Sequence, residues 1–295
     1  MKNFFRNVFY LLLFLFTITN AQNITEKQNW SADELEVKDK VEQFLFAAGN
    51  YNLDAFKQMI SDKASVGIVR LKDGERVSSV LTIGEYYQGV NERKLRPYYE
   101  PVKEFTIDVT DGHLAFVKAD ATLYVYGVPQ SYNMDCFTLI KENGSWKFIN
   151  LSYSATPVSV NEKKFDLDIF AKNYAQAWCS QRPDFVASFY TDNGSLNVNN
   201  GTPAIGREGI SKVAKSYMTA FPDIIVSLDS LIKTSVGIEF HWTFTGTNTG
   251  PDGTGKKVRV HGFELWQLEN GLIKESKGSY DSKEYERQLK YGIDN

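Results

Sequence analysis

Glu264 is the residue of this 295-residue chain whose surroundings most directly suggest chemistry. It lies in residues 258–271, V-R-V-H-G-F-E-L-W-Q-L-E-N-G, where apolar and polar residues alternate up to an Asn-Gly pair. This pattern is typical of a β-hairpin, and it puts Glu264 on the same face as Trp266 and opposite to His261. A carboxyl group beside a tryptophan is either exposed to water or buried with a shifted pKa. Only the buried state points to chemistry.

The first half of the chain contains the same pattern. Residues 134–154 again alternate around an Asn-Gly turn, and aligning the two segments puts Asp135 opposite Glu264. Extending the alignment upstream puts Phe44 opposite Tyr174. Self-similarity over this length predicts two copies of one architecture.

We therefore predict an α+β chain of two tandem cone-shaped domains, each with three helices packed on a curved antiparallel sheet. The first domain is expected at residues 30–156, where Ser31 and Glu34 form a capping-box pattern at the start of a helix. The second is expected at residues 165–295. Residues 157–164 show no periodicity and are interpreted as a linker.

A curved sheet of this kind encloses a cavity between its concave face and the helices, lined by alternate strand residues. We expect the functional cavity in the second domain. The residues expected to line it are Tyr174, Trp178, Tyr217, Glu264 and Trp266, and Asp135 is the corresponding candidate in the first domain.

The amino end has the pattern of a secretory signal. Lys2 and Arg6 precede an apolar run at residues 8–18 that is short for a membrane span, and small residues follow up to Ala21. We expect residues 1–21 to be a signal peptide cleaved after Ala21, which predicts a secreted or periplasmic protein. An uncleaved anchor is the alternative.

Removal of this segment takes two positive charges from a net charge of −3 and leaves about −5. An acidic chain is a poor partner for nucleic acid or an anionic membrane, so we expect neither. The chain has two cysteines, Cys136 and Cys179, in different repeats. Their apolar contexts favour buried thiols over a disulfide between the domains.

Several motifs of the second copy resemble the SnoaL-like polyketide cyclases of the nuclear transport factor two-like superfamily. They are F-Y-T-D-N-G-S-L-N-V at residues 189–198, A-F-P-D at 220–223 and H-W-T-F-T-G-T-N-T-G at 241–250. The first copy is similar to stand-alone secreted members, through F-L-F-A-A-G-N-Y-N-L-D-A-F at 44–56. The resemblance implies the fold more than the reaction, because the superfamily holds both enzymes and non-catalytic binders.

The resemblance also implies roles for individual residues. By similarity to ketosteroid isomerase, Tyr174 and Glu264 would be neutral donors that stabilise an enolate in an apolar cavity. The position of that enzyme's basic aspartate is taken by Val198, which cannot abstract a proton. By similarity to the cyclases, Asp281 with either His241 or His261 would do acid/base work.

We expect an exported protein that binds a small hydrophobic or carbonyl-containing molecule in an apolar pocket of the second domain, without turnover. The alternatives are a lyase, isomerase or cyclase acting on a carbonyl compound, and a protein-interaction module. A shared metal at His241, His261 and Glu264 is disfavoured because the chain has only three scattered histidines. We predict no cofactor and no metal, and we expect the domains to pack on each other as a pseudo-dimer.

Overall fold

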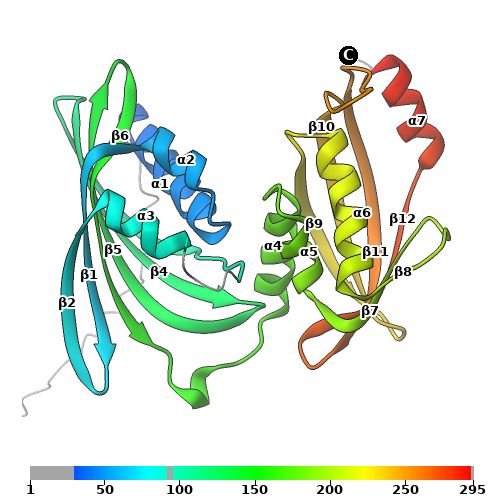
Figure 1. The fold of residues 1–295 in the computed structure, drawn as a ribbon, viewed down its shortest axis with the longest axis horizontal. Helices are drawn as coiled ribbons and strands as arrows, with labels where there is room; N and C mark the ends of the chain where they lie inside the picture. The colour runs from blue at the N-terminus through cyan, green and yellow to red at the C-terminus, as the bar shows by residue number, and fades with distance from the viewer. Residues whose placement is uncertain (1–29, 92–95, 294–295) are drawn as a thin grey trace, which may run out of the picture.

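The chain forms two tandem α+β domains, as predicted (Figure 1). The computed structural model describes residues 30–91 and 96–293, so the predicted signal peptide lies outside the described residues. Within those residues, no helix is both long and apolar enough to cross a membrane.

The first domain places three helices on the concave side of a six-stranded sheet (Figure 1). The sheet order is β2-β1-β6-β5-β4-β3, and all neighbours are antiparallel except β1 and β6. The sheet is therefore mixed, because the β1–β2 hairpin docks beside the last strand of the domain. The elements are α1 (Ala32–Gly49), α2 (Leu53–Met59), β1 (Ile60–Lys72), β2 (Glu75–Thr82), α3 (Ile83–Asn91), β3 (Val102–Thr110), β4 (Leu114–Val125), β5 (Val128–Glu142) and β6 (Ser145–Pro157).

The second domain repeats this topology strand for strand. Its sheet order is β8-β7-β12-β11-β10-β9, again with one parallel pair, β7 and β12. A short 3-10 helix, η1 (Val160–Glu162), lies in the predicted linker. The elements are α4 (Leu167–Trp178), α5 (Pro183–Ser188), β7 (Tyr190–Val198), β8 (Ala204–Ile205), α6 (Gly206–Ala220), β9 (Ile225–Lys233), β10 (Ile238–Thr247), β11 (Lys257–Glu269), β12 (Leu272–Tyr280) and α7 (Ser282–Tyr291).

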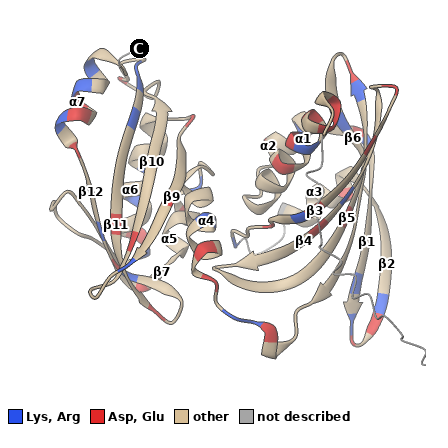
Figure 2. Ribbon diagram, turned by 180° about the vertical axis from the view of Figure 1, so that it is seen from behind, with Lys and Arg blue, Asp and Glu red and all other residues tan. Residues whose placement is uncertain are grey.

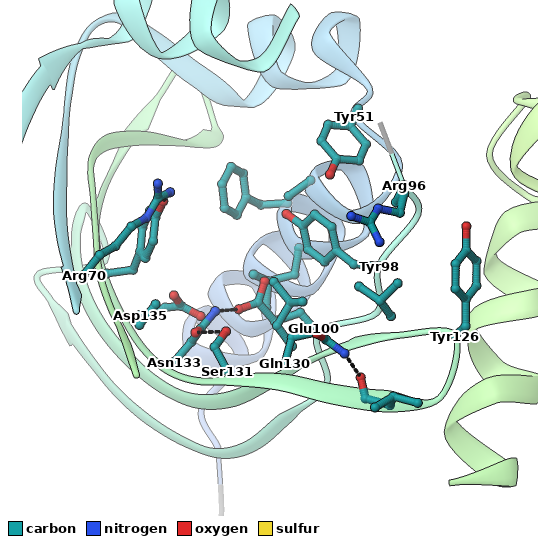
Figure 3. A pocket seen from close by; sticks show the side chains of 18 of the residues that line it. Tyr51, Arg70, Arg96, Tyr98, Glu100, Tyr126, Gln130, Ser131, Asn133 and Asp135 are labelled. Carbon is teal, nitrogen blue, oxygen red and sulfur yellow. Dashed lines mark hydrogen bonds between the residues drawn. The ribbon is translucent and has the colours of Figure 1, made fainter. Parts of the chain in front are cut away.

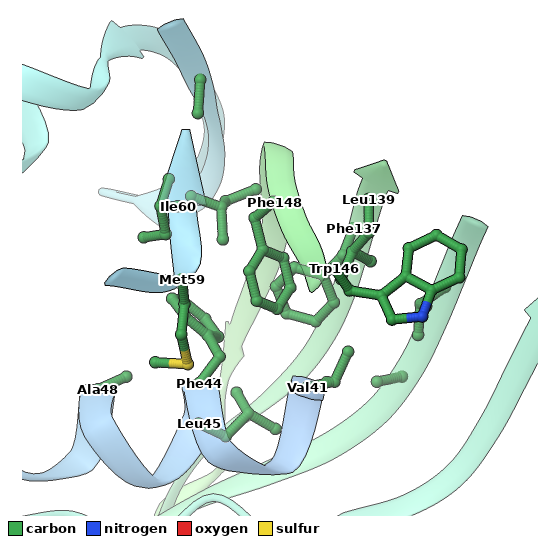
Figure 4. Packing of buried hydrophobic residues seen from close by; sticks show 14 of the residues in the cluster. Val41, Phe44, Leu45, Ala48, Met59, Ile60, Phe137, Leu139, Trp146 and Phe148 are labelled. Atoms are coloured by element: carbon green, nitrogen blue, oxygen red, sulfur yellow. The ribbon is translucent and has the colours of Figure 1, made fainter. Parts of the chain in front are cut away.

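Each domain has its own hydrophobic core between the helices and the sheet. In the first, the ring of Phe44 from α1 packs against Phe137 and Phe148 at centroid distances of 5.5 and 5.0 Å (Figure 4). In the second, Tyr174 from α4 packs edge-on against Trp266 at 5.2 Å. Phe44 and Tyr174, which the sequence repeat aligns, therefore both pack against aromatic rings of the sheet in their own domain.

The domains contact each other directly. The rings of Tyr126 and Phe189 meet edge to face at 5.1 Å. The backbone N–H of Asp166 donates to the carbonyl of Gly127 at 2.8 Å.

Charged residues of both signs are interspersed along α1 and α7 (Figure 2).

Both cysteines are free thiols. Cys179 is half-buried, but Cys136 is exposed, so the prediction of a buried thiol was wrong there. Strand alternation is the reason, since Cys136 follows the inward-facing Asp135 and must face outward.

Candidate functional site

Glu264 is buried at the centre of the second domain, where its carboxyl group accepts hydrogen bonds from four side chains. Ser276 Oγ donates to Oε2 at 2.6 Å and Trp266 Nε1 donates at 2.9 Å. The Tyr174 hydroxyl lies 3.1 Å from Oε2, and the Tyr190 hydroxyl lies 3.5 Å from it. Trp266 is on β11 with Glu264, whereas the other three donors come from β12, α4 and β7. The fold of the domain therefore brings these side chains together around the carboxyl group.

Burial dominates the electrostatics of this network. Desolvation raises the pKa of Glu264 above its ordinary value, although the four donors oppose the shift. Desolvation, together with the charge of Glu264, raises the pKa of Tyr174 and of Tyr190 well above the ordinary range. Both hydroxyls keep their protons at neutral pH and remain donors to the carboxyl group.

The hollow next to Glu264 is much smaller than expected. Its volume is about 70 Å³, whereas pockets for drug-sized ligands measure about 300–1,000 Å³. Three of the expected residues, Trp178, Tyr217 and Glu264, line it. Trp266 lies behind them, fully buried and stacked on Phe240 at a centroid distance of 4.6 Å. Aromatic rings thus fill most of the space that the sequence had suggested for a ligand.

The other proposed catalytic residues lie away from Glu264. His241 and His261 are paired across β10 and β11 with Phe263 and Thr243, on the opposite face of the sheet from Glu264. His241 Nε2 is 2.9 Å from Glu239 Oε2, and His261 Nδ1 is 2.8 Å from Thr243 Oγ1.

Asp281 is the N-cap of α7. Its carboxylate accepts from the backbone N–H groups of Lys283 and Glu284 at 3.0 and 3.1 Å. Capping explains an aspartate at this strand end without any catalytic role. Among residues 30–91 and 96–293, no three His, Cys, Asp or Glu side chains form a cluster that would hold a metal ion.

A much larger cavity than the hollow beside Glu264 lies in the first domain (Figure 3). Its volume is about 750 Å³, and it lies between the concave face of the sheet, α1 and the segment leading to β3. Its apolar wall includes Phe44, Leu45, Val66, Phe137 and Leu151. The Asn270-Gly271 turn of the second domain contributes to the same lining, so both domains enclose this cavity.

Two carboxyl groups, Glu100 and Asp135, line this cavity beside Asn133 (Figure 3). The Asn133 amide donates to Glu100 and accepts from Ser131 Oγ at 2.8 Å. Burial raises the pKa of Glu100 to about 7. Burial, and then the charge of Glu100, raises the pKa of Asp135 to about 8. Near neutral pH the pair therefore holds at least one proton.

Two arginines and several tyrosines also line the cavity. The guanidinium of Arg70 donates to the Tyr153 hydroxyl and lies 5.5 Å from the centre of that ring. Arg70 and Arg96 are exposed, whereas Asp135 is only 5% exposed. The rings of Tyr51 and Tyr98 meet at a right angle, 5.8 Å apart. The basic groups are thus exposed to solvent, and the acidic pair lies in the interior.

Asp135 on β5 and Glu264 on β11 occupy equivalent places. These two strands have the same position in the two sheet orders, and both side chains are buried. Trp266 pairs with Ser276 in the second sheet, and the equivalent pair in the first is Phe137 with Leu151. Tyr190 pairs with Ile273 at the start of β7, where the first domain has Ile60 with Phe148 at the start of β1. The fourth donor, Tyr174, corresponds to Phe44. All four donors to Glu264 are therefore replaced by hydrocarbon side chains around Asp135.

This replacement leaves Asp135 unsatisfied. Its Oδ2 atom is buried and has no hydrogen-bond partner among the described residues. A buried polar atom without a partner costs about 1–3 kcal/mol, so a donor from water or from a ligand would stabilise this oxygen. The sequence had singled out Asp135 but not Glu100, which lies outside the regular strands and 35 positions upstream.

Residues 169–289 match the family model of the SnoaL-like polyketide cyclases. The expected resemblance is thus confirmed for the second domain. No curated protein matches the chain.

Three solved structures illustrate the similarity. One is a SnoaL-like polyketide cyclase, so described, from Jannaschia sp. CCS1 (14% identity, covering 43% of this chain and 82% of that one, TM-score 0.32). Another is a polyketide cyclase, so described, from Bacillus cereus (19% identity, 46% and 87%, TM-score 0.36). The third is an NTF2-like protein of unknown function from Shewanella baltica (16% identity, 44% and 100%, TM-score 0.35).

Proposed function

We propose that this chain is a small-molecule-binding protein and that its ligand occupies the cavity of the first domain. The observation that carries the proposal is the 750 Å³ cavity that contains the unsatisfied Oδ2 atom of Asp135. Its size is that of a pocket for a drug-sized molecule, and its wall combines apolar side chains with a few convergent polar groups.

The second domain supports this binding role as a scaffold. The carboxyl group of Glu264 is occupied by four internal donors, and the hollow beside it holds about 70 Å³. Enolate stabilisation by Tyr174 and Glu264 would need room for a carbonyl substrate against those two groups. The small volume favours binding without turnover over the lyase, isomerase or cyclase alternative. A protein-interaction module would not require the first-domain cavity.

Export belongs to the proposal. Residues 1–21 have the composition of a cleavable signal, which would deliver the protein to the periplasm or the medium. Sequencing the amino terminus of the mature protein tests this. We expect it to begin at Gln22, and a mature protein that retains residues 1–21 would contradict export by cleavage.

Blocking the cavity tests the binding function. Ala155 lines the cavity, so Ala155→Trp would fill part of it with an indole ring. Ala32 is exposed at the start of α1, so Ala32→Trp is the matched control. Native mass spectrometry of protein purified from its own host should show a bound small molecule in the wild type and in Ala32→Trp, but not in Ala155→Trp. Equal ligand occupancy in all three proteins, or none in the wild type, would contradict the proposal.

A further inference from the structure

The buried acidic pair in the first-domain cavity is only partly satisfied by the side chains of the described residues. Asp135 Oδ2 has no hydrogen-bond partner in the part of the chain that the structure describes. Glu100 accepts a hydrogen bond from the amide of Asn133, and its own burial disfavours the charged form. The negative charge of Glu100 then disfavours ionisation of Asp135. A group that carries a positive charge and a hydrogen-bond donor would stabilise both carboxylates.

We propose that this pair binds the protonated amine of a ligand whose body is apolar, an inference that rests on the small-molecule-binding function above. An ammonium group donates to the free Oδ2 atom and also stabilises the negative charge of both carboxylates. A neutral hydroxyl group would satisfy the free oxygen but would not reduce the repulsion between the two carboxylates.

The rest of the cavity suits an organic cation. The rings of Tyr51 and Tyr98 form a corner of the wall, and Tyr126 and Tyr153 line it as well. Tyrosine faces attract ammonium groups by about 0.5–2 kcal/mol. The apolar wall formed by Phe44, Leu45, Val66, Phe137 and Leu151 accepts the hydrocarbon part. A bare metal ion is a poorer occupant, because no cluster of three metal-ligating side chains exists among the described residues.

The two arginines of the lining do not replace the ligand cation. Arg70 is exposed and directs its guanidinium to the hydroxyl and ring of Tyr153. Arg96 is also exposed, beside the segment that leads to Glu100. Water screens both charges, whereas the carboxyl group of Asp135 is buried.

Amine binding is expected to be coupled to protons. The ligand needs at least one ionised carboxylate, so it competes with the protons that the pair holds. The pKa values of about 7 and about 8 put this competition between pH 6 and 9. The affinity for an amine that stays charged should therefore rise by at least about tenfold from about pH 6 to about pH 8.5. The titratable and charged groups that line this cavity are Arg70, Arg96, Glu100, Asp135 and the tyrosines 51, 86, 98, 126 and 153.

Three probes of similar shape test the inference: phenethylamine, phenethyl alcohol and hydrocinnamate. Isothermal titration with the whole mature protein at about pH 8.5 should show the amine binding at least about tenfold more tightly than the alcohol or the carboxylate. Asp135→Asn and Glu100→Gln should each weaken amine binding by about tenfold or more and change alcohol binding by less than about twofold. Glu104→Gln removes an exposed carboxylate outside the cavity lining and is the matched control, with unchanged affinities expected.

The outcomes separate this inference from the proposed function. Preference for the alcohol or the carboxylate, or amine affinity that does not change with pH or in Asp135→Asn, overturns cation binding and leaves the cavity as a small-molecule site. Failure of all three probes to bind at millimolar concentration overturns cation binding as well. The small-molecule function itself is then decided separately by the ligand occupancy of Ala155→Trp. Circular dichroism of each variant verifies that it is folded.

Discussion

The side-chain amide of Gln176 in the second domain donates to the backbone carbonyl of Tyr98 in the first at 3.0 Å. Tyr98 also lines the large cavity, so this hydrogen bond joins the second domain to the cavity wall. Gly49, at the end of α1, lies directly beside the bond. A Cβ atom at Gly49 would be 2.2 Å from the Tyr98 oxygen and 2.8 Å from the Gln176 Nε2. This hydrogen bond between the domains therefore requires a residue without a Cβ atom at position 49.

Gly49→Ala should destabilise the protein and weaken ligand binding together. The added methyl group must push Tyr98 and Gln176 apart, which we expect to cost about 1–3 kcal/mol of unfolding free energy. Urea unfolding measures this cost. Gly89→Ala is the control, because its Cβ would meet nothing within 4 Å in α3, and it should gain up to about 1 kcal/mol. If Gly49→Ala and Gly89→Ala have similar unfolding free energies, Tyr98 and Gln176 can move without cost and the prediction is wrong.

Glu264 is expected to contribute to stability rather than to ligand binding. Glu264→Gln replaces one acceptor oxygen by an NH₂ group that faces the donors Ser276, Trp266 and Tyr174, and should cost about 1–3 kcal/mol. Affinity for the first-domain ligand should stay within about twofold of the wild type. The control is Glu269→Gln, which changes an exposed carboxylate of the same strand and should cost less than about 1 kcal/mol. A stable Glu264→Gln protein that lost a measurable enzymatic activity would instead support catalysis in the second domain.

The acidic pair should make stability fall as the pH rises. The folded protein holds protons on Glu100 and Asp135 up to about pH 7 to 8, whereas the unfolded chain releases them near pH 4. The stabilisation is therefore complete below about pH 4 and is lost progressively as the pH rises through the folded-state pKa values. Asp135→Asn removes the contribution of Asp135. In the absence of ligand, its unfolding free energy relative to wild type should increase from about pH 4 to about pH 8. Urea unfolding at several pH values measures the difference, and a constant difference would contradict the raised pKa.

The fold was predictable because its signals are local. Alternation around two Asn-Gly turns and helical apolar spacing are repeated in both halves of the chain, and the capping box of Ser31 and Glu34 forms as expected. The strand β7 was not predicted. Its sequence, Y-T-D-N-G-S-L-N-V, is rich in residues typical of turns. It becomes a strand because it pairs in parallel with β12, from a distant part of the chain.

The buried position of Glu264 beside Trp266 and Tyr174 was also within reach of the sequence, since alternation and the repeat both pointed to it. The same alternation already put His261 on the other face. The relative size of the two cavities was not predictable from local patterns. Ala119 of β4 pairs with Asp135, whereas the larger Phe240 of β10 pairs with Glu264. Such differences in side-chain volume change the size of a cavity only after the sheets have closed around the helices.

Ring size at Trp242 offers a direct test of why the second hollow is small. Trp242 lines this hollow, packs over Gly262 and corresponds to Ala121 of the first domain. Trp242→Ala should open an indole-sized space beside Glu264 at a cost of up to about 3 kcal/mol, because the side chain is only partly buried. Added indole should refill that space and raise the melting temperature of the variant by several degrees, since a ligand that binds only the folded state stabilises it. The wild type is the control and should not respond. If indole leaves the variant unchanged, the hollow has collapsed, and the rings around Glu264 are not what limits its volume.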